Sequence, residues 1–138
     1  MYGALDTSVS GMVAQRVRMN TIAANLANRS TVADAQGNAA PYQRRIPIFE
    51  VGDPSAQSAE GRSSGVHVSE ILLDEAPPRM VLEPNSPYAD ADGYVAYPNI
   101  DPMTEQVSIM EAARAYEANV AAAEATKSLV AQLVRLLG

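Results

Sequence analysis

The sequence predicts a mainly α-helical protein with a small β module in its middle. Near both ends, apolar residues recur at alternating spacings of four and three, the 3.5-residue repeat of a helix that packs lengthwise on another helix. The middle lacks this repeat and holds short apolar runs between proline and glycine turns. We therefore expect terminal helices over 1–30 and 101–138 that pair as a coiled coil. The segment 31–100 is expected to form a small β-rich module of short strands and loops.

The first helix is expected from about residue 6 or 7 to about residue 28, because Asp6 and Thr7 supply capping oxygens for its first turn. Gly11 lies inside it, where glycine costs about 1 kcal/mol relative to alanine. Either another backbone passes close to Gly11 or the glycine is simply tolerated. The apolar repeat of this helix consists of Leu5, Val9, Met12, Arg16, Met19, Ala23 and Leu26.

The middle of the chain reads as short extended pieces between loops. Residues 29–41 are small and polar and predict a loop, and residues 42–51 predict a short extended piece. The composition of residues 52–65 is that of a loop or mobile linker. Strands this short need a helix or another chain beside them to be stable. Three further strands are expected over 66–73, 79–83 and 94–97.

The second helix has a clear start. Asp101 is suited to the N-cap and Pro102 to the first helical position, where its missing N–H had no partner to lose. No further glycine or proline occurs before Gly138. The helix should therefore run for roughly 36 residues, or about 54 Å.

The second helix carries two apolar seams. The first consists of Ile109, Ala113, Tyr116, Val120, Ala123, Lys127, Val130, Val134 and Leu137. The second consists of Ala112, Ala115, Asn119, Ala122, Thr126, Leu129, Leu133 and Leu136. One partner helix covers one seam, so two seams predict neighbours on two sides. The second helix should also exceed the first by about 14 residues, or about 21 Å, and we expect another chain to cover this excess.

Two charged side chains interrupt the seams, Arg16 in the first helix and Lys127 in the second. A charged residue at such a position commonly sets the helix register at some cost in stability. The alternative is that each side chain extends its charge to the edge of the seam. Tyr88, Tyr94 and Tyr97 in the middle are likewise open to two interpretations, as anchors of an interface or as core packing.

Composition excludes several classes of function. The net charge is −6, and residues 50–105 hold eleven acidic and two basic side chains, which does not suit a nucleic-acid partner. The apolar C-terminal segment is interrupted by Lys127, Gln132 and Arg135, so no membrane insertion is expected. The first eleven residues lack a basic region before an apolar run, and no cleaved signal peptide is expected.

No catalytic, metal or cofactor site is expected. Cysteine is absent, and His67 is the only histidine, without partners at ligand spacing. Asp90, Asp92 and Gly93 resemble the opening of a calcium loop, but glycine comes at the fourth position instead of the sixth, which favours an acidic turn. No nucleophile–base set or phosphate-binding glycine loop is present. We therefore expect no enzyme, no cofactor and no small-molecule substrate.

Several motifs resemble those of the flagellar rod, hook and related axial proteins. At the N-terminal end these are Ser10-Gly11, Arg18-Met19-Asn20 and Asn25-Leu26-Ala27-Asn28. A narrower resemblance, to proximal-rod proteins of the bacterial flagellar basal body, rests on the segments DGYVAYPN at 92–99 and ARAYEANV at 113–120. The middle also fits, with GVHV at 65–68 leading to PPR at 77–79.

This resemblance implies a structural protein of the motility machinery. In that family, paired terminal helices form the inner coiled-coil layer of a helical tube that transmits torque and encloses an export channel. The resemblance implies that the central segment forms a small outer domain in contact with neighbouring subunits. It further implies type III export without a cleaved signal peptide and assembly in the periplasm. The implied partners are copies of this chain, other rod proteins and the base formed by the export apparatus and the MS ring. A cytosolic coiled-coil adaptor or export chaperone that binds one partner helix is the alternative.

The resemblance and the seams together predict an assembly interface. Asn25, Leu26 and Asn28 would form a packing and turn motif, and residues 113–120 the matching helix surface. Tyr94 and Tyr97 are expected as contacts of the central module. The other expected interface residues are Leu5, Val9, Met12, Met19, Ile109, Ala113, Tyr116, Asn119, Val120, Leu129, Val130, Leu133, Val134, Leu136 and Leu137.

Overall fold

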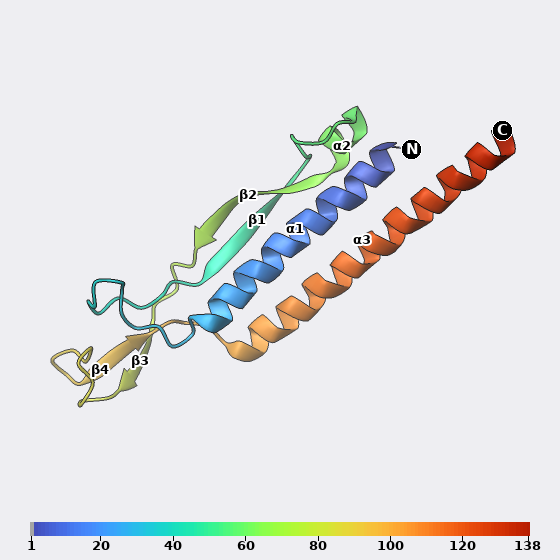
Figure 1. The fold of residues 1–138 in the computed structure, drawn as a ribbon. Helices are drawn as coiled ribbons and strands as arrows, with labels where there is room; N and C mark the ends of the chain where they lie inside the picture. The colour runs from blue at the N-terminus through green and yellow to red at the C-terminus, as the bar shows by residue number, and fades with distance from the viewer. Residues whose placement is uncertain (1) are drawn as a thin grey trace.

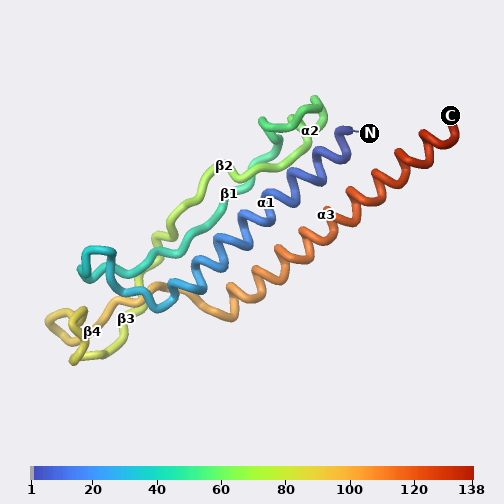
Figure 2. The backbone as a smooth tube through the Cα atoms, in the orientation of Figure 1, coloured from blue at the N-terminus to red at the C-terminus, as the bar shows by residue number. Residues whose placement is uncertain are grey.

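Two long antiparallel helices lie side by side and dominate the fold (Figure 1). The computed structural model describes residues 2–138. A β-hairpin runs along the first helix on the side away from the second, and another small β-hairpin lies at one end of the helix pair (Figures 1 and 2). The prediction of two terminal helices with short strands between them is confirmed.

Helix α1 (Tyr2–Ala27) begins about one turn earlier than predicted. Asp6 does not cap it, because its carboxylate accepts a hydrogen bond from the backbone N–H of Ser58, at 3.0 Å. The helix ends as its sequence suggests: the side-chain amide of Asn28 donates to the carbonyl of Ala24, at 2.9 Å, and closes the last turn.

Helix α3 (Pro102–Leu137) has the predicted start and length, with 36 residues. The carboxylate of Asp101 accepts hydrogen bonds from the backbone N–H groups of Met103 and Thr104, at 3.3 and 3.2 Å. These bonds satisfy donors that have no partner inside the helix.

The hairpin beside α1 consists of β1 (Arg45–Val51) and β2 (Val66–Leu73), paired antiparallel with an irregularity between Ile48 and Phe49. A short helix, α2 (Ala59–Ser64), lies in the connection between the two strands. A loop or linker is therefore the wrong prediction for 59–64. Helix α2 is capped by Ser58 and lies against the first turns of α1, a tertiary contact that composition does not reveal.

The remaining strands, β3 (Arg79–Leu82) and β4 (Tyr94–Tyr97), form a separate two-stranded sheet. The bounds of β2 and β4 are those predicted, and β3 ends one residue early. Among these strand residues Val95 is the one that is fully buried, so this sheet contributes little core of its own.

The interior of the described chain is built mostly from small or polar residues. Large apolar side chains such as Val9, Met110 and Leu133 face solvent. Helix α1 contacts α3 on one side and β1, β2 and α2 on the other, so few of its positions have room for a large side chain. Its buried residues are Gly3, Ser8, Ser10, Gly11, Ala14, Thr21, Ile22 and Asn25.

Candidate assembly surfaces

The contact between α1 and α3 is rotated away from the predicted seam of α1, whereas on α3 it follows Ala112, Asn119 and Thr126 of the predicted second seam. Val9, Arg16 and Ala23 of the α1 repeat are exposed, whereas Leu5, Met12, Met19 and Leu26 are half-buried. The α1 residues that contact α3 each lie one position before Met12, Met19 or Leu26 of the predicted repeat. Gly11 adjoins Asn119, Arg18 pairs with Glu111, and Asn25 is hydrogen-bonded to Glu105. The structure does not confirm a coiled coil centred on the predicted seam of α1. Of that apolar repeat, Val9, Arg16 and Ala23 mark an open face.

On α3 the most covered line of residues recurs every seven positions. Glu105 and Ala112 are buried and Asn119 and Thr126 are half-buried along it. Three of these four residues are polar, so the covered line is not a hydrophobic seam. Of the residues predicted for the first seam, Ile109, Ala113, Tyr116, Val120, Ala123 and Val130 are half-buried, and Lys127, Val134 and Leu137 are exposed.

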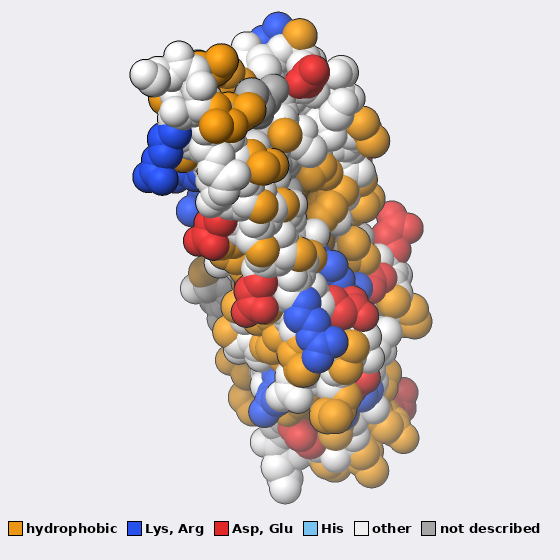
Figure 3. Space-filling view, turned by 90° about the vertical axis from the view of Figure 1, so that its right-hand side faces the viewer, with side chains coloured by type: hydrophobic (Ala, Val, Ile, Leu, Met, Phe, Trp, Pro, Cys, Tyr) orange, Lys and Arg blue, Asp and Glu red, His pale blue; other side chains and the backbone are white. Residues whose placement is uncertain are grey.

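The C-terminal end of α3 has no cover from its own chain. Helix α3 has 36 residues and α1 has 26, so α3 is longer by about 15 Å. This excess is shorter than predicted because α1 begins at Tyr2. Every residue from 131 to 138 is exposed, and hydrophobic side chains are open to solvent along the molecule (Figure 3). The large ones at this end are Leu129, Leu133, Val134, Leu136 and Leu137, with exposed fractions from 42 to 89%.

An apolar groove adjoins this uncovered end. It has a volume of about 380 Å³ and lies where α1 begins, between Tyr2 and Leu5 of α1 and Lys127, Val130 and Ala131 of α3. Together the groove and the end of α3 form one apolar surface at this end of the helix pair. We call this surface, made of the five groove residues and Leu129, Leu133, Val134, Leu136 and Leu137, the α3-end surface.

A buried polar cluster joins the two helices to the hairpin at the other end. The carboxylate of Glu105 accepts from Nε of Arg44, at 2.6 Å, and from the side-chain amide of Asn25, at 3.3 Å. Asn25 also exchanges two hydrogen bonds with the backbone of Arg45, both at 2.9 Å. We call Asn25, Arg44 and Glu105 the Glu105 cluster.

Asn25 is therefore an internal contact. Only 1% of its surface is exposed, and its hydrogen-bond partners belong to its own chain. Nothing in its spacing indicated the partners, because Arg44 and Arg45 lie in the segment before β1 and in β1 itself. The packing role that the resemblance implies agrees with this position.

The two tyrosines expected as contacts of the central module differ. The hydroxyl of Tyr97 donates to the carboxylate of Glu83, at 3.1 Å, and Arg79 lies over its ring at 5.6 Å. The hydrogen bond to Glu83 raises the pKa of Tyr97 above its ordinary value of 10.0. Tyr97 thus packs within its own sheet, whereas Tyr94 is 40% exposed.

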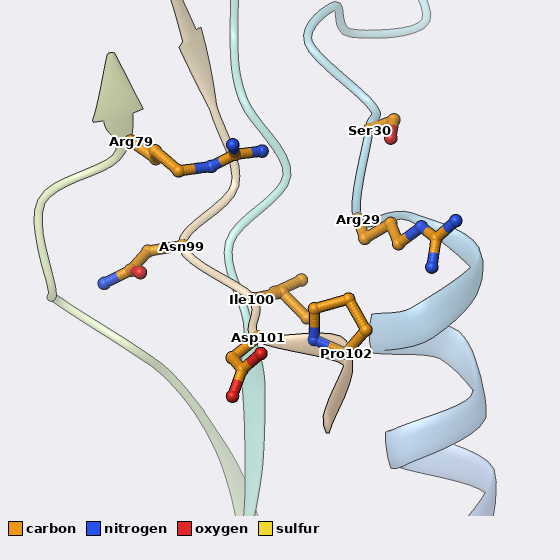
Figure 4. Close-up of a pocket in the computed structure, with 7 residues that line it drawn as sticks. All are labelled: Arg29, Ser30, Arg79, Asn99, Ile100, Asp101 and Pro102. Carbon is orange, nitrogen blue, oxygen red and sulfur yellow. The ribbon is translucent and has the colours of Figure 1, made fainter. Parts of the chain in front are cut away.

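A polar hollow of about 400 Å³ lies between the end of α1, the start of β3 and the loop that leads into α3. In the close-up, Arg79 enters it from β3 and Arg29 lies on the opposite side, beside Ser30 (Figure 4). Asp101, the N-cap of α3, forms part of the lining. The hollow combines exposed charges of both signs, as on an ordinary polar surface.

His67 and Asp90, for which no metal site is expected, have local structural roles. The ring of His67 shares a hydrogen bond of 2.6 Å with the carbonyl of Gly52. The carboxylate of Asp90 accepts from the backbone N–H groups of Asp92 and Tyr94, both at 2.9 Å, which makes this segment an acidic turn. Across residues 2–138, no three acidic or histidine side chains are grouped to hold a metal ion. None of the described helices is both long and apolar enough to span a membrane.

Comparison of the sequence with known proteins identifies the family of this chain. A family model described as flagella basal body rod protein matches residues 5–32, and one described as flagellar basal body rod FlgEFG protein C-terminal matches residues 91–136. The chain is 39% identical to the flagellar basal-body rod protein FlgC of Aquifex aeolicus over 94% of its own length and 91% of that protein. It belongs to the FlgC family of flagellar basal-body rod proteins.

Other FlgC proteins are similarly close. Identity to that of Bacillus subtilis is 37%, over 98% of this chain and 97% of the relative. The chain is 36% identical to the FlgC protein of Salmonella typhimurium, over 95% of this chain and 93% of the relative. As a FlgC family member, the chain is a structural rod subunit of the flagellar basal body and not an enzyme. This finding does not favour the adaptor or chaperone alternative.

Proposed function

We propose that this chain forms part of the wall of the rod, with its two long helices packed lengthwise against those of neighbouring subunits. The observation that carries the proposal is the α3-end surface, where large apolar side chains lie open on a helix that its own chain does not cover. Burying one such side chain is worth about 1.5 to 3 kcal/mol, so neighbours that cover several of them gain substantial binding free energy.

The open face of α1 supports the same arrangement. Val9 and Val13 are 48% and 47% exposed, on a helix whose buried positions hold small residues. A subunit inside a wall needs apolar contact faces on more than one side, whereas a subunit of a simple dimer needs one. The two helices together present such faces, and Val9, Met12 and Met19 belong to the face offered by α1.

The partners we propose are copies of this chain, other rod proteins and the base formed by the export apparatus and the MS ring. In this role the assembled subunits would enclose the export channel and transmit torque along the rod. The chain would reach the periplasmic space through the flagellar type III system. The family assignment supports the rod partners, and the uncovered surfaces support more than one neighbour for each subunit.

The test places charges on the α3-end surface. In a flagellated host whose own FlgC is replaced by this chain, Leu129→Asp with Leu133→Asp should abolish swimming, because two buried carboxylates would oppose subunit packing. Basal bodies isolated from these cells should lack a complete rod in electron micrographs. Motility in soft agar and immunoblots for protein level accompany the micrographs.

A matched control carries the same charge on a polar side of the same turns. Ser128→Asp with Gln132→Asp changes exposed positions next to the leucines and should preserve swimming and intact rods. Normal swimming of the leucine variant, at a normal protein level, would contradict the proposed wall.

A further inference from the structure

The apolar repeat alone does not determine how far α1 and α3 slide along one another. A repeat of seven residues stays in phase after a shift of one heptad, which is about 10.5 Å along a helix. Small side chains such as Ala4, Ala112 and Thr126 offer little resistance to such a shift. Some feature that does not repeat must therefore specify the observed register.

Besides the solvent-screened ion pair of Arg18 with Glu111, two contacts between the helices do not repeat. Along α3 the covered line reads Glu105, Ala112, Asn119 and Thr126. Along α1, the same step of seven residues through Asn25 and Gly11, which contact Glu105 and Asn119, passes Arg18 and reaches Ala4. Asn25 is bonded to Glu105 at one end, and Gly11 adjoins Asn119 fourteen residues further along both helices. Both contacts hold only in this register.

Gly11 provides the space that Asn119 occupies. A Cβ atom at Gly11 would lie 2.8 Å from the side-chain nitrogen of Asn119, closer than atoms can pack. The amide is held in place because it donates a hydrogen bond to the carbonyl of Ala115, at 2.8 Å. A shift of one heptad would place Asn119 opposite Arg18 or Ala4, which both carry the Cβ that Gly11 lacks.

The contact between Asn25 and Glu105 penalises the same shifts. Each residue is 1% exposed, and each needs polar partners. Asn25 would keep its bonds to the backbone of Arg45 after a shift, but Glu105 would lose the Asn25 amide. In one direction, a heptad shift would place Ala112 opposite Asn25 and remove Glu105 from the Asn25 amide. In the other direction, Arg18 would face Glu105, but Asn25 would lie beyond the start of α3 and Asn119 would meet Ala4.

We propose that these two contacts, Gly11 with Asn119 and Asn25 with Glu105, specify the register of the helix pair. They thereby determine which side chains of α1 and α3 lie together on the outer faces. A buried polar residue in a helix seam has this role in other proteins, where it selects one register at a cost in stability. The proposal concerns one chain by itself and does not depend on the proposed role in the rod.

Because the sequence has no cysteine, introduced thiols can report the register directly. Arg18→Cys with Glu111→Cys marks the observed register, in which the two native side chains lie 3.3 Å apart. Arg18→Cys with Ala118→Cys marks a shift of one heptad. In the otherwise unchanged full-length chain, a short thiol cross-linker should join 18 to 111 and leave 18 and 118 unjoined, as measured by mass spectrometry.

Removal of both contacts should release the register. With Glu105→Leu and Asn119→Ala added, the yield of the 18–118 product should rise about tenfold or more relative to 18–111, while circular dichroism shows the helices retained. Gln106→Ala with Thr126→Ala, which removes two polar side chains of α3 outside both contacts, should leave 18–111 dominant.

Gly11→Leu provides a second and independent measurement. It blocks the space for Asn119 without altering the Glu105 cluster, and it should also raise the 18–118 product. Continued dominance of the 18–111 product in both backgrounds would overturn the proposal. If the double variant loses its helices, Gly11→Leu decides the question alone, and an unchanged 18–111 product there overturns it.

Discussion

At the scale of single residues, the molecule buries several polar groups and leaves many large apolar side chains exposed. Glu105 is the clearest case, a carboxylate on a helix that is buried by another helix and by the segment before β1. Its partners Arg44 and Asn25 come from positions 61 and 80 residues away. Without Glu105, Arg44 would keep only Asp74, at 3.7 Å, and Asn25 would keep its bonds to the backbone of Arg45. Breaking a buried charge pair in this way costs more than the pair itself contributes.

We therefore expect Glu105→Ala to lower the free energy of unfolding by about 3 kcal/mol, because Arg44 and Asn25 would lose their shared acceptor. Urea unfolding of the full chain followed by circular dichroism measures this change. The control is Glu111→Ala, which breaks an exposed ion pair with Arg18 and should cost about 0.5 kcal/mol or less. Equal effects of the two substitutions would argue against the cluster.

At the scale of elements, local signals were sufficient wherever the determinant lies within a few residues. Asp101 and Pro102 predict the start of α3, and the bounds of β2 and β4 follow from turns beside them. Helix α2 was missed because its stability comes from contact with α1, a partner distant in sequence. The rotation of the helix contact was missed because apolar spacing identifies an apolar face but not what covers it.

The Asp101 cap gives α3 a dependence on pH. A hydrogen bond from the hydroxyl of Thr104, and then bonds from the N–H groups of Met103 and Thr104, lower the pKa of Asp101 below its ordinary 3.8. Because the pKa is lower in the folded state, the cap stabilises the chain above pH 3.8. This contribution is lost as pH falls through the lowered value.

Asp101→Ala should accordingly reduce the thermal unfolding midpoint by several degrees at pH 7, with a smaller reduction as the pH falls below 3.8. Melting curves by circular dichroism over a pH series measure the difference. Asp92→Ala removes the same charge from an exposed turn and should change the midpoint little at any pH. A difference between Asp101→Ala and the unchanged chain that is constant with pH would contradict the cap.

At the scale of the whole molecule, the sequence predicted two long helices and uncovered apolar surface, and the structure describes both. It named Ala112, Asn119 and Thr126 of the covered line on α3, but it did not predict the residues of α1 that face inward. Asn119 was expected at an interface between subunits, and it lies half-buried beside Gly11 of its own chain. Periodicity treats Asn119 and Ala112 alike, and only a three-dimensional neighbour distinguishes them.

A chain with so small an interior should gain order from its neighbours. We expect the helix content of the purified chain to rise with protein concentration, because uncovered helices that pack together stabilise one another. Circular dichroism over a dilution series measures this rise. The Leu129→Asp and Leu133→Asp variant should lose most of the rise, and full helix content in the most dilute samples would contradict the expectation.

The placement of apolar surface on the outside also determines how temperature acts on the assembly. Exposure of apolar surface governs the heat capacity of unfolding. This subunit buries few large apolar side chains, among them Val95 and Ile100, and should therefore have a shallow stability curve. In the proposed rod wall, contact between subunits would bury Leu129, Leu133 and Leu136 instead, so the large negative heat-capacity change would belong to association. Cooling weakens that driving force. The interfaces between subunits should therefore be more sensitive to cold than the folded subunits themselves.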